Sequence, residues 1–539
     1  MKTGKTVKVL LTAATAAGML AGCGSKTDTD TFRFASELDI QGMDSTVADD
    51  GMSFNAIHAI TDGLTAVNEK GKTAPAIAKS WDVSDDGKTY TFHLRDAKWT
   101  NGDKVTANDF VYSWRKIIKD AGNYAYMLGS GGASVKNADA LMELGANATD
   151  EQMATLGVTA KDDQTLVVEL ENKVPYFTDL MAFPCYFPQN EKFVEKCGKN
   201  YGTKPEYTLS NGAYTMTKWI KGNKATFTKN DKYYDAKAVK TKNLEMFLVQ
   251  DPKTAAQNFD NGKVDYATIN STLVDKYKGK DTFTTFNEGY LFYLQVNFKN
   301  NTVANKNVRE ALAYAINRKD LCENVLKDGS MAATGFVPSQ LSKSPAGKDF
   351  RDDADKYVSY DQKKAQEYLD AAKKELGTDT ITIDLLYGTD ESPMDTMAEY
   401  LQGSFSKLKG LKVNMVATVK KDRIYNREAN GNFQVVCTRW GPDYADPTTY
   451  LNLALTDNSN NYGKYANAKF DALMEQIQKE SDLTKRWDLM IQAEKVMMED
   501  MAYIPVFEKG SAALKAKNVK GLVVVPVGTP YTFKYVKLK

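Results

Sequence analysis

The sequence predicts a mixed α/β (α+β) protein built from several domains. Short strand patterns and amphipathic helical patterns alternate along the chain, which favours this class over a helical bundle or a β-sandwich. The chain has 539 residues, of which 42% are hydrophobic and 26% charged, as is typical of a globular protein with a large core. At ~150 residues per domain this length corresponds to three or four domains. Because we find no repeat and no long linker, we expect the domains to be interwoven.

The N-terminus has the pattern of an export signal. Lysines precede an apolar run from Val9 to Leu20 that is too short to span a bilayer. The next residues, up to Cys23, read Leu-Ala-Gly-Cys and resemble the bacterial lipobox, in which the signal is removed and the cysteine is acylated. This resemblance implies a lipoprotein signal peptide at 1–22 and lipidation of Cys23, with a flexible tether at 23–30. An ordinary secretory signal with a chance cysteine is the alternative. We expect the protein to lie at the extracellular face of the cell membrane, on a Gram-positive-type surface, with the lipid as its sole anchor.

Local patterns predict individual elements. Thr89 to Arg95 alternates apolar and polar residues like a half-buried strand, with His93 on its polar face. Thr106 is placed to cap a helix, with Asp109 in the first turn and apolar residues at helical spacing up to Ile118. The alternation continues through 225–229, 291–297, 308–316, 365–372, 381–387 and 484–498.

Composition limits the possible partners and chemistry. The formal net charge is +1 and the chain has only two histidines, so we expect no nucleic-acid partner, no metal site and no cofactor. Four cysteines remain after Cys23: Cys185, Cys197, Cys322 and Cys437. Cys185 and Cys197 could form a disulfide, but free buried thiols are favoured for a chain of this length.

Motifs of common enzymes were not found. The chain has no phosphate-binding G-x-x-x-x-G-K-[ST] loop, no dinucleotide-binding G-x-G-x-x-G after a strand, no H-E-x-x-H and no G-x-S-x-G. Its many carboxylates leave a two-carboxylate hydrolase open without supporting it. We therefore expect a binding protein rather than an enzyme.

Several sequence blocks resemble the extracellular solute-binding proteins of peptide and nickel ABC importers, family 5, and most resemble their oligopeptide-binding branch. The blocks follow the family's order through nearly the whole chain after the signal. They are residues 76–115, Ser210-Asn211-Gly212-Ala213-Tyr214, 230–234, 307–318, Trp440-Gly441-Pro442-Asp443-Tyr444-Ala445-Asp446-Pro447 and 503–506.

The resemblance implies a two-lobed fold, like that of periplasmic binding proteins, with three interwoven domains and a hinge. Domain I would comprise residues 31–61, 189–289 and 509–539. Domain II would be residues 62–188, and domain III, the mobile lobe, residues 290–508. A monomer is expected.

The resemblance also implies the ligand-binding residues. Asp443 would form an ion pair with the α-amino group of a peptide, worth about 1.5–3 kcal/mol when closed off from water. A structural role for Asp443, capping a turn near Pro447, is the alternative. Trp440 and Tyr444 would wall the same pocket or belong to the core.

The resemblance implies that two further segments belong to the site. Asn211, Gly212 and Tyr214 resemble a turn that brings backbone close to the ligand, although the turn alone would explain them. Glu37 and Leu38 begin a segment up to Ile40 that resembles the edge strand pairing with peptide backbone.

This chain departs from some Gram-negative relatives. An arginine that meets the C-terminal carboxylate of the peptide in those relatives is replaced by Cys437, and a histidine is missing near Pro393. A disulfide of the third domain is also missing, because Tyr290 and Gly441 occupy its positions. How the peptide's C-terminus is held, and which peptide length is preferred, stay open.

We therefore expect a lipid-anchored receptor that captures oligopeptides and delivers them to ABC permease subunits. The alternatives are another solute, such as a signalling peptide, a nickel chelate or a sugar, and a surface hydrolase. The scarcity of histidine disfavours nickel.

Overall fold

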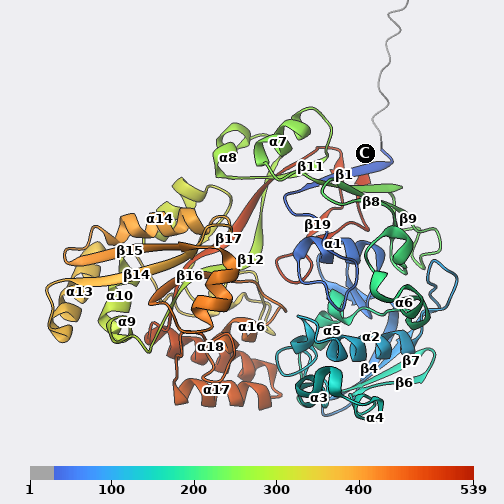
Figure 1. Cartoon of the computed structure of the whole chain (residues 1–539), viewed down its shortest axis with the longest axis horizontal. Helices are drawn as coiled ribbons and strands as arrows, with labels where there is room; N and C mark the ends of the chain where they lie inside the picture. The colour runs from blue at the N-terminus through green and yellow to red at the C-terminus, as the bar shows by residue number, and fades with distance from the viewer. Residues whose placement is uncertain (1–28) are drawn as a thin grey trace, which may run out of the picture.

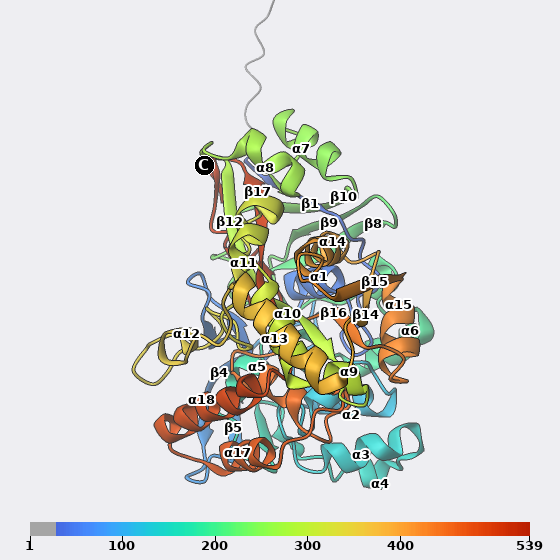
Figure 2. The ribbon, with the colours of Figure 1, turned by 90° about the vertical axis from the view of Figure 1, so that its left-hand side faces the viewer.

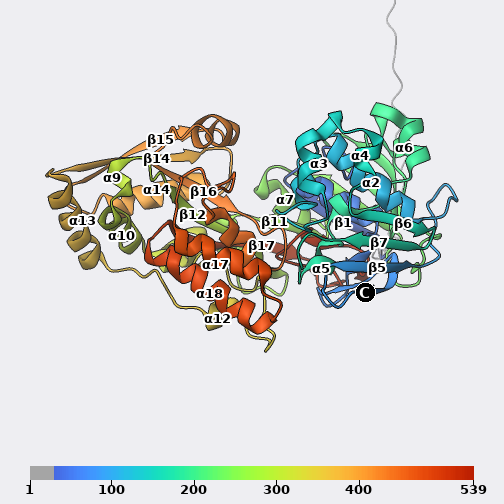
Figure 3. The same ribbon diagram turned by 90° about the horizontal axis from the view of Figure 1, so that it is seen from below.

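A computed structural model describes residues 29–539, which form two lobes (Figure 1). Lobe 1 contains strands β1–β11 and helices α1–α8 together with the C-terminal end, and lobe 2 contains α9–α18 with β14–β16. Figure 3 shows the lobes side by side from below, with α17 and α18 on one and β5, β7 and α5 on the other. The predicted signal peptide and Cys23 lie outside the described residues.

One eleven-stranded mixed sheet runs through both lobes. Its order is β15 (Leu411–Thr418), β14 (Ile381–Gly388), β16 (Val435–Trp440), β12 (Phe283–Val296), β17 (Tyr503–Lys515), β11 (Tyr266–Ile269), β1 (Thr31–Ser36), β10 (Asn243–Leu248), β9 (Lys224–Lys229) and β8 (Tyr214–Ile220), with β13 (Met331–Ala332) on β17. The mixed α/β prediction is confirmed.

The long strands β12 and β17 connect the lobes. At one end β17 pairs with β11 of lobe 1, and at the other β12 pairs with β16 of lobe 2. Their pairing shifts register between Asn287 and Leu291. Gly289 in this interval has φ +80° and lies so close to the backbone of Pro526 that a Cβ would clash. This irregularity is a natural place for a bend, and it coincides with the predicted boundary of domains I and III.

A second, antiparallel sheet lies in lobe 1. Its order is β4 (Ala78–Val83), β5 (Thr89–Leu94), β7 (Thr165–Glu169) and β6 (Val158–Asp162). The predicted alternation is confirmed in β5, where Tyr90, Phe92 and Leu94 are buried. Helix α2 also begins as predicted, because the backbone N–H of Thr106 donates to Asp109 Oδ2 at 2.8 Å.

The helices of lobe 1 are α1 (Gly51–Ile60), α2 (Ala107–Lys119), α3 (Ala138–Leu144), α4 (Asp150–Met153), α5 (Phe177–Leu180), α6 (Glu191–Cys197), α7 (Pro252–Asp260) and α8 (Ser271–Tyr277). Those of lobe 2 are α9 (Asn301–Ala304), α10 (Lys306–Ala315), α11 (Arg318–Asp320), α12 (Phe350–Asp353), α13 (Gln362–Leu376), α14 (Met394–Phe405), α15 (Lys420–Asp422), α16 (Thr448–Leu451), α17 (Ala468–Lys479) and α18 (Leu483–Glu499). Figure 2 shows α10 and α13 packed together on the outer face of lobe 2. Each lobe has a large hydrophobic core of its own.

The segment from Glu37 to Ile40 differs from its predicted form. Strand β1 ends at Ser36, whose hydroxyl accepts from the backbone N–H of Leu38 and donates to its carbonyl. These local bonds turn the chain, so Glu37–Ile40 is not a strand. Strand β1 is moreover an inner strand, parallel to both β10 and β11. The edge-strand prediction was wrong.

The positions of the domain boundaries stay predictions, although the chain passes into lobe 2 and back as expected. Among residues 29–539, no helix is both long and apolar enough to cross a membrane.

Candidate ligand-binding site between the lobes

The loop that follows β16 reaches from lobe 2 into lobe 1. Its residue Tyr444 is buried with the core residues of lobe 1. The Tyr444 ring stacks on that of Tyr176, which precedes α5, with ring centroids 4.2 Å apart and planes 3° apart. The loop is therefore a point of direct contact between the lobes. Tyr444 is both core and a wall of the cavities described below.

A buried ion pair holds this loop. Arg486 of α18 donates to both carboxylate oxygens of Asp446, at 2.6 and 2.9 Å. Asp446 also accepts from the backbone and hydroxyl of Thr448 at the start of α16. The carboxylate of Asp446 has all its partners within lobe 2, so its role is structural.

Asp443, three residues earlier, has a different environment. The hydroxyl of Tyr126 in lobe 1 donates to its carboxylate, while its backbone N–H donates to the Thr449 hydroxyl at 3.1 Å. No lysine or arginine of the described chain forms an ion pair with it. Burial is the main cause that raises the pKa of Asp443, to about 7. The residue is partly buried, and a cation placed beside its carboxylate would stabilise the charged form.

Two cavities meet at Asp443 and Tyr444. The larger is about 770 Å³ and is lined from lobe 1 by residues that include Tyr126 and Asp139, and from lobe 2 by residues of the loops after β16. The smaller is about 340 Å³. It is lined from lobe 1 by residues that include His58 and Asp179, and from lobe 2 by residues that include Gln340 and Leu341. Cavities of this size between two lobes are typical binding sites for small organic ligands.

Trp440 ends β16 and lines the larger cavity. Its indole N–H is buried and has no hydrogen-bond acceptor in the protein. A buried donor without a partner costs free energy. The structure places Asp443, Trp440 and Tyr444 at one cavity, and their contact with a ligand stays a prediction.

Asn211, Gly212 and Tyr214 lie elsewhere, at the junction of α1 and β8. The Asn211 side chain accepts from the backbone N–H of Asp62 at 2.7 Å, and the backbone N–H groups of Asn211 and Gly212 donate to the carbonyl of Ile60. All three predicted residues are buried, and none lines the two cavities. Their contacts describe a structural turn, and contact with ligand stays a prediction.

Glu37 and Leu38 are exposed residues beside the strands that connect the lobes. The Leu38 side chain is 63% exposed. Neither lines the two cavities, so their contact with ligand also stays a prediction.

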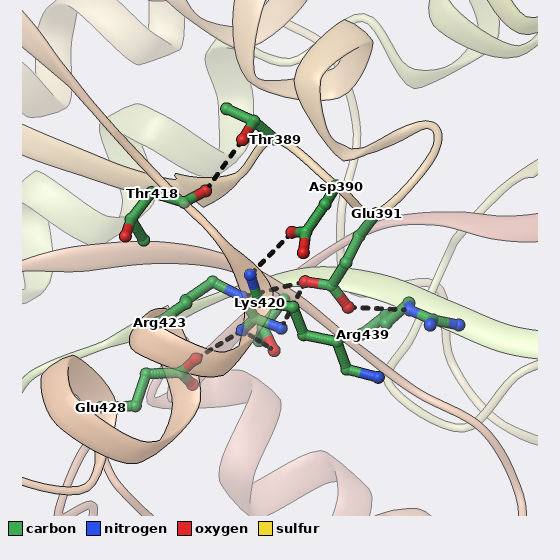
Figure 4. Close-up of polar contacts among 9 residues, drawn as sticks. Thr389, Asp390, Glu391, Thr418, Lys420, Arg423, Glu428 and Arg439 are labelled. Carbon is green, nitrogen blue, oxygen red and sulfur yellow. Dashed lines mark hydrogen bonds and ion pairs between the residues drawn. The ribbon is translucent and has the colours of Figure 1, made fainter. Parts of the chain in front are cut away.

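A network of charged residues lies where β14, β15 and β16 end in lobe 2 (Figure 4). Arg423 donates to Glu391 at 2.8 Å, to Glu428, and to the Thr438 hydroxyl at 2.9 Å. Arg439 extends the network to Glu391, with Nε 3.5 Å from Oε1. Burial raises the pKa of Glu428 to about 7, against the opposing effect of Arg423. These contacts fix the loops at the edge of the sheet that carries Trp440.

The two positions that hold counter-charges in some relatives are occupied by residues without charge. Cys437 is fully buried in β16, and Pro393 precedes α14. The guanidinium of Arg423 near Cys437 is itself buried and paired with carboxylates.

Free thiols are found at all four described cysteines, as was favoured over a Cys185–Cys197 bridge. Among residues 29–539, no group of three or more His, Cys, Asp or Glu side chains is arranged to hold a metal ion.

Sequence reasoning missed the lobe 1 side of the site. Tyr126 and Tyr176 precede Asp443 and Tyr444 by more than 250 residues, and no local pattern connects them. The tyrosines near a glycine-rich stretch at 129–132 were a possible signal, because glycine lets a backbone approach another lobe closely.

Comparison with known proteins identifies solute-binding and peptide-binding proteins as relatives of this chain. The family model of bacterial extracellular solute-binding proteins, family 5 Middle, matches residues 72–462. A dipeptide-binding protein of Lactococcus lactis subsp. cremoris is 34% identical over 561 residues, covering 100% of both chains. The oligopeptide-binding protein OppA of Bacillus subtilis is 32% identical, covering 90% of this chain and 88% of its own.

Solved structures share the whole fold. Listeria monocytogenes OppA bound to peptide superposes with a TM-score of 0.79 at 33% identity, covering 95% of this chain and 99% of its own. The pheromone receptor PrgZ gives a TM-score of 0.80 at 31% identity, covering 95% and 100%. The relatives named here, whether found by sequence or by structure, are peptide-binding proteins by their names or titles.

Proposed function

Because the chain is a member of family 5 of the bacterial extracellular solute-binding proteins, we propose that it captures oligopeptides between its lobes and delivers them to an ABC-type importer. Relatives with a dipeptide, an oligopeptide or a peptide pheromone in their names support this ligand class.

One observation carries the proposal: the partly buried carboxylate of Asp443 lines both cavities between the lobes and forms no ion pair with a described lysine or arginine. The α-ammonium group of a peptide would supply that partner. The ring of Trp440 in the same cavity would pack against the peptide. The charged group that Asp443 would recognise is common to every peptide with a free N-terminus, whatever its side chains.

Closure of the lobes follows from the same contacts. Tyr126 and Tyr176 belong to lobe 1, whereas Asp443 and Tyr444 belong to lobe 2. A peptide held by Asp443 would contact both lobes only when they are closed, so it would shift the population towards the closed form. The irregular pairing of β12 with β17 is the proposed hinge.

The N-terminal anchor is the second part of the proposal. Acylation of Cys23 would hold the protein at the extracellular face of the membrane, next to the permease. Metabolic labelling with a palmitate analogue tests it: the wild type should become labelled and Cys23→Ser should not. An unlabelled wild type would contradict the anchor alone.

Calorimetric titration tests the ligand class. The chain from Ser25 onward, refolded to remove bound ligand, would be titrated with a mixture of short free-amine peptides, with maltose and with a nickel chelate. We expect heat only with peptides, which should be recovered intact. Binding of the sugar or the chelate instead would favour the alternative solutes, and cleaved peptides would favour a hydrolase.

A further inference from the structure

The larger cavity beside Asp443 is lined by acidic residues and by no basic ones. Asp139 comes from lobe 1, and Asp443, Asp457 and Asp471 come from lobe 2. No lysine, arginine or histidine is among its lining residues. The smaller cavity differs, because Lys72 and His58 line it together with Asp179 and Asp443.

The four carboxylates differ in the hydrogen bonds that they accept from the protein. Asp471 accepts from the backbone and the hydroxyl of Thr456, and Asp139 accepts from the backbone N–H of Ser130 at 3.1 and 3.2 Å. Neither has a cationic partner. Asp457 is exposed at the cavity and forms no ion pair with a described residue. The negative charge of the cavity is thus not neutralised by the protein.

The cavity lies between the lobes, and Asp443 on its wall forms no ion pair with a described lysine or arginine. Trp440, Leu453 and Leu455 also supply apolar surface beside the carboxylates. This combination suits a side chain with an aliphatic stem and a cationic end.

We propose that this cavity takes a lysine or arginine side chain near the N-terminus of the peptide, so that the receptor prefers basic peptides. The inference rests on the proposed function, because the α-ammonium group at Asp443 places the first residues of the peptide beside the cavity. A glutamate side chain at the same position would be repelled by the same carboxylates.

Matched tetrapeptides test this preference. Lysine, norleucine and glutamate would be placed in turn at each position of a free-amine tetra-alanine peptide, and affinities would be measured by calorimetry at low salt. At one of the first positions we expect lysine to bind about fivefold or more tighter than norleucine, and glutamate to bind more weakly than both. The lysine advantage should shrink at high salt, because mobile ions screen the partly exposed Asp139 and Asp457.

Two exposed aspartates allow a test in the protein. The double variant Asp139→Asn/Asp457→Asn should lose most of the preference for lysine over norleucine, measured as the ratio of the two affinities within the same protein. Asp85→Asn, an exposed aspartate of lobe 1 outside both cavities, is the control and should keep the preference.

The outcomes separate the inference from the proposed function. Equal affinity for lysine, norleucine and glutamate peptides at every position would overturn the basic preference and leave peptide binding standing. A lysine preference unchanged in the double variant would also overturn it. If none of the peptides binds, the proposed function itself fails.

Discussion

Tyr176 of lobe 1 and Tyr444 of lobe 2 stack with ring centroids 4.2 Å apart and nearly parallel planes. Tyr444 is 3% exposed and lies in the loop that follows β16 of lobe 2. The stack therefore couples the position of the loop that carries Asp443 to the relative position of the lobes.

Removal of this stack should weaken peptide binding. Tyr176→Ala loses an aromatic contact worth about 1 kcal/mol beyond its buried area, so we expect about fivefold or greater loss of affinity by calorimetry. Tyr176→Phe keeps the ring and should retain most of the affinity. Equal affinities of the two variants would show that the stack does not contribute to closure.

Asp443 and Asp446, three residues apart in one motif, should respond differently to the same substitution. Asp446→Asn removes one member of a buried ion pair and leaves Arg486 without its counter-charge, so it should lower the free energy of unfolding by about 3–5 kcal/mol. Asp443→Asn removes a partly buried carboxylate that has no cationic partner among the described residues, so the free energy of unfolding of this variant should be unchanged or higher. Urea unfolding of the ligand-free proteins checks both, and a reversed order would contradict these roles.

Closure of the ligand-free lobes should depend on pH. The closed form raises the pKa of Asp443 to about 7, whereas opening would expose the carboxyl and return its pKa towards the ordinary value. The closed form thus binds a proton that the open form releases. Closure should therefore become more favourable as pH falls from 8 towards 5, by up to about tenfold in population per pH unit.

Small-angle scattering measures this effect through the radius of gyration, which should decrease at lower pH. The Asp443→Asn variant should show a much smaller dependence. What remains would come from Asp179 and His58 in the smaller cavity, because burial raises the pKa of Asp179 and lowers that of His58. Asp109 and Glu428 also have raised pKa values, but both lie within single lobes and should affect unfolding rather than the distance between the lobes. If the radius of gyration of Asp443→Asn decreases at lower pH as much as that of the wild type, another group causes the pH dependence.

The turn at Gly212 should be structural. A Cβ at Gly212 would lie 2.7 Å from backbone atoms of Ile60 and Thr61, so Gly212→Ala should lower the free energy of unfolding by about 1–3 kcal/mol. Gly403 of helix α14 has open space around it, and Gly403→Ala should raise stability by about 0.5–1 kcal/mol. Thermal unfolding of both variants checks the contrast; an unperturbed Gly212→Ala protein would argue against a tight turn.

Much of the fold was predictable because local patterns determine it. Alternation identified β5, and a capping residue with apolar helical spacing identified α2. The end of β1 was not predictable in this way, because the side chain of Ser36 forms local hydrogen bonds that turn the chain after a strand-like run.

The site was predictable only in part. The motif around Trp440 pointed to Asp443, but it could not distinguish the role of Asp443 from that of Asp446, which depends on the distant Arg486. Tyr126 and Tyr176 were missed for the same reason, since contacts between lobes join residues far apart in sequence. The acidic lining of the cavity likewise combines residues from separate segments of the chain.

Asp443 is proposed to bind the free N-terminus of a peptide, and calorimetry with paired peptides measures this contact. One peptide with a free α-amino group and its N-acetylated copy would be titrated into the wild type and Asp443→Asn. In the wild type, acetylation should lower affinity by about tenfold to a hundredfold. In Asp443→Asn the free-amine peptide should bind with a similar loss, and acetylation should have little further effect. If acetylation weakens binding equally in both proteins, or in neither, Asp443 does not hold the N-terminus.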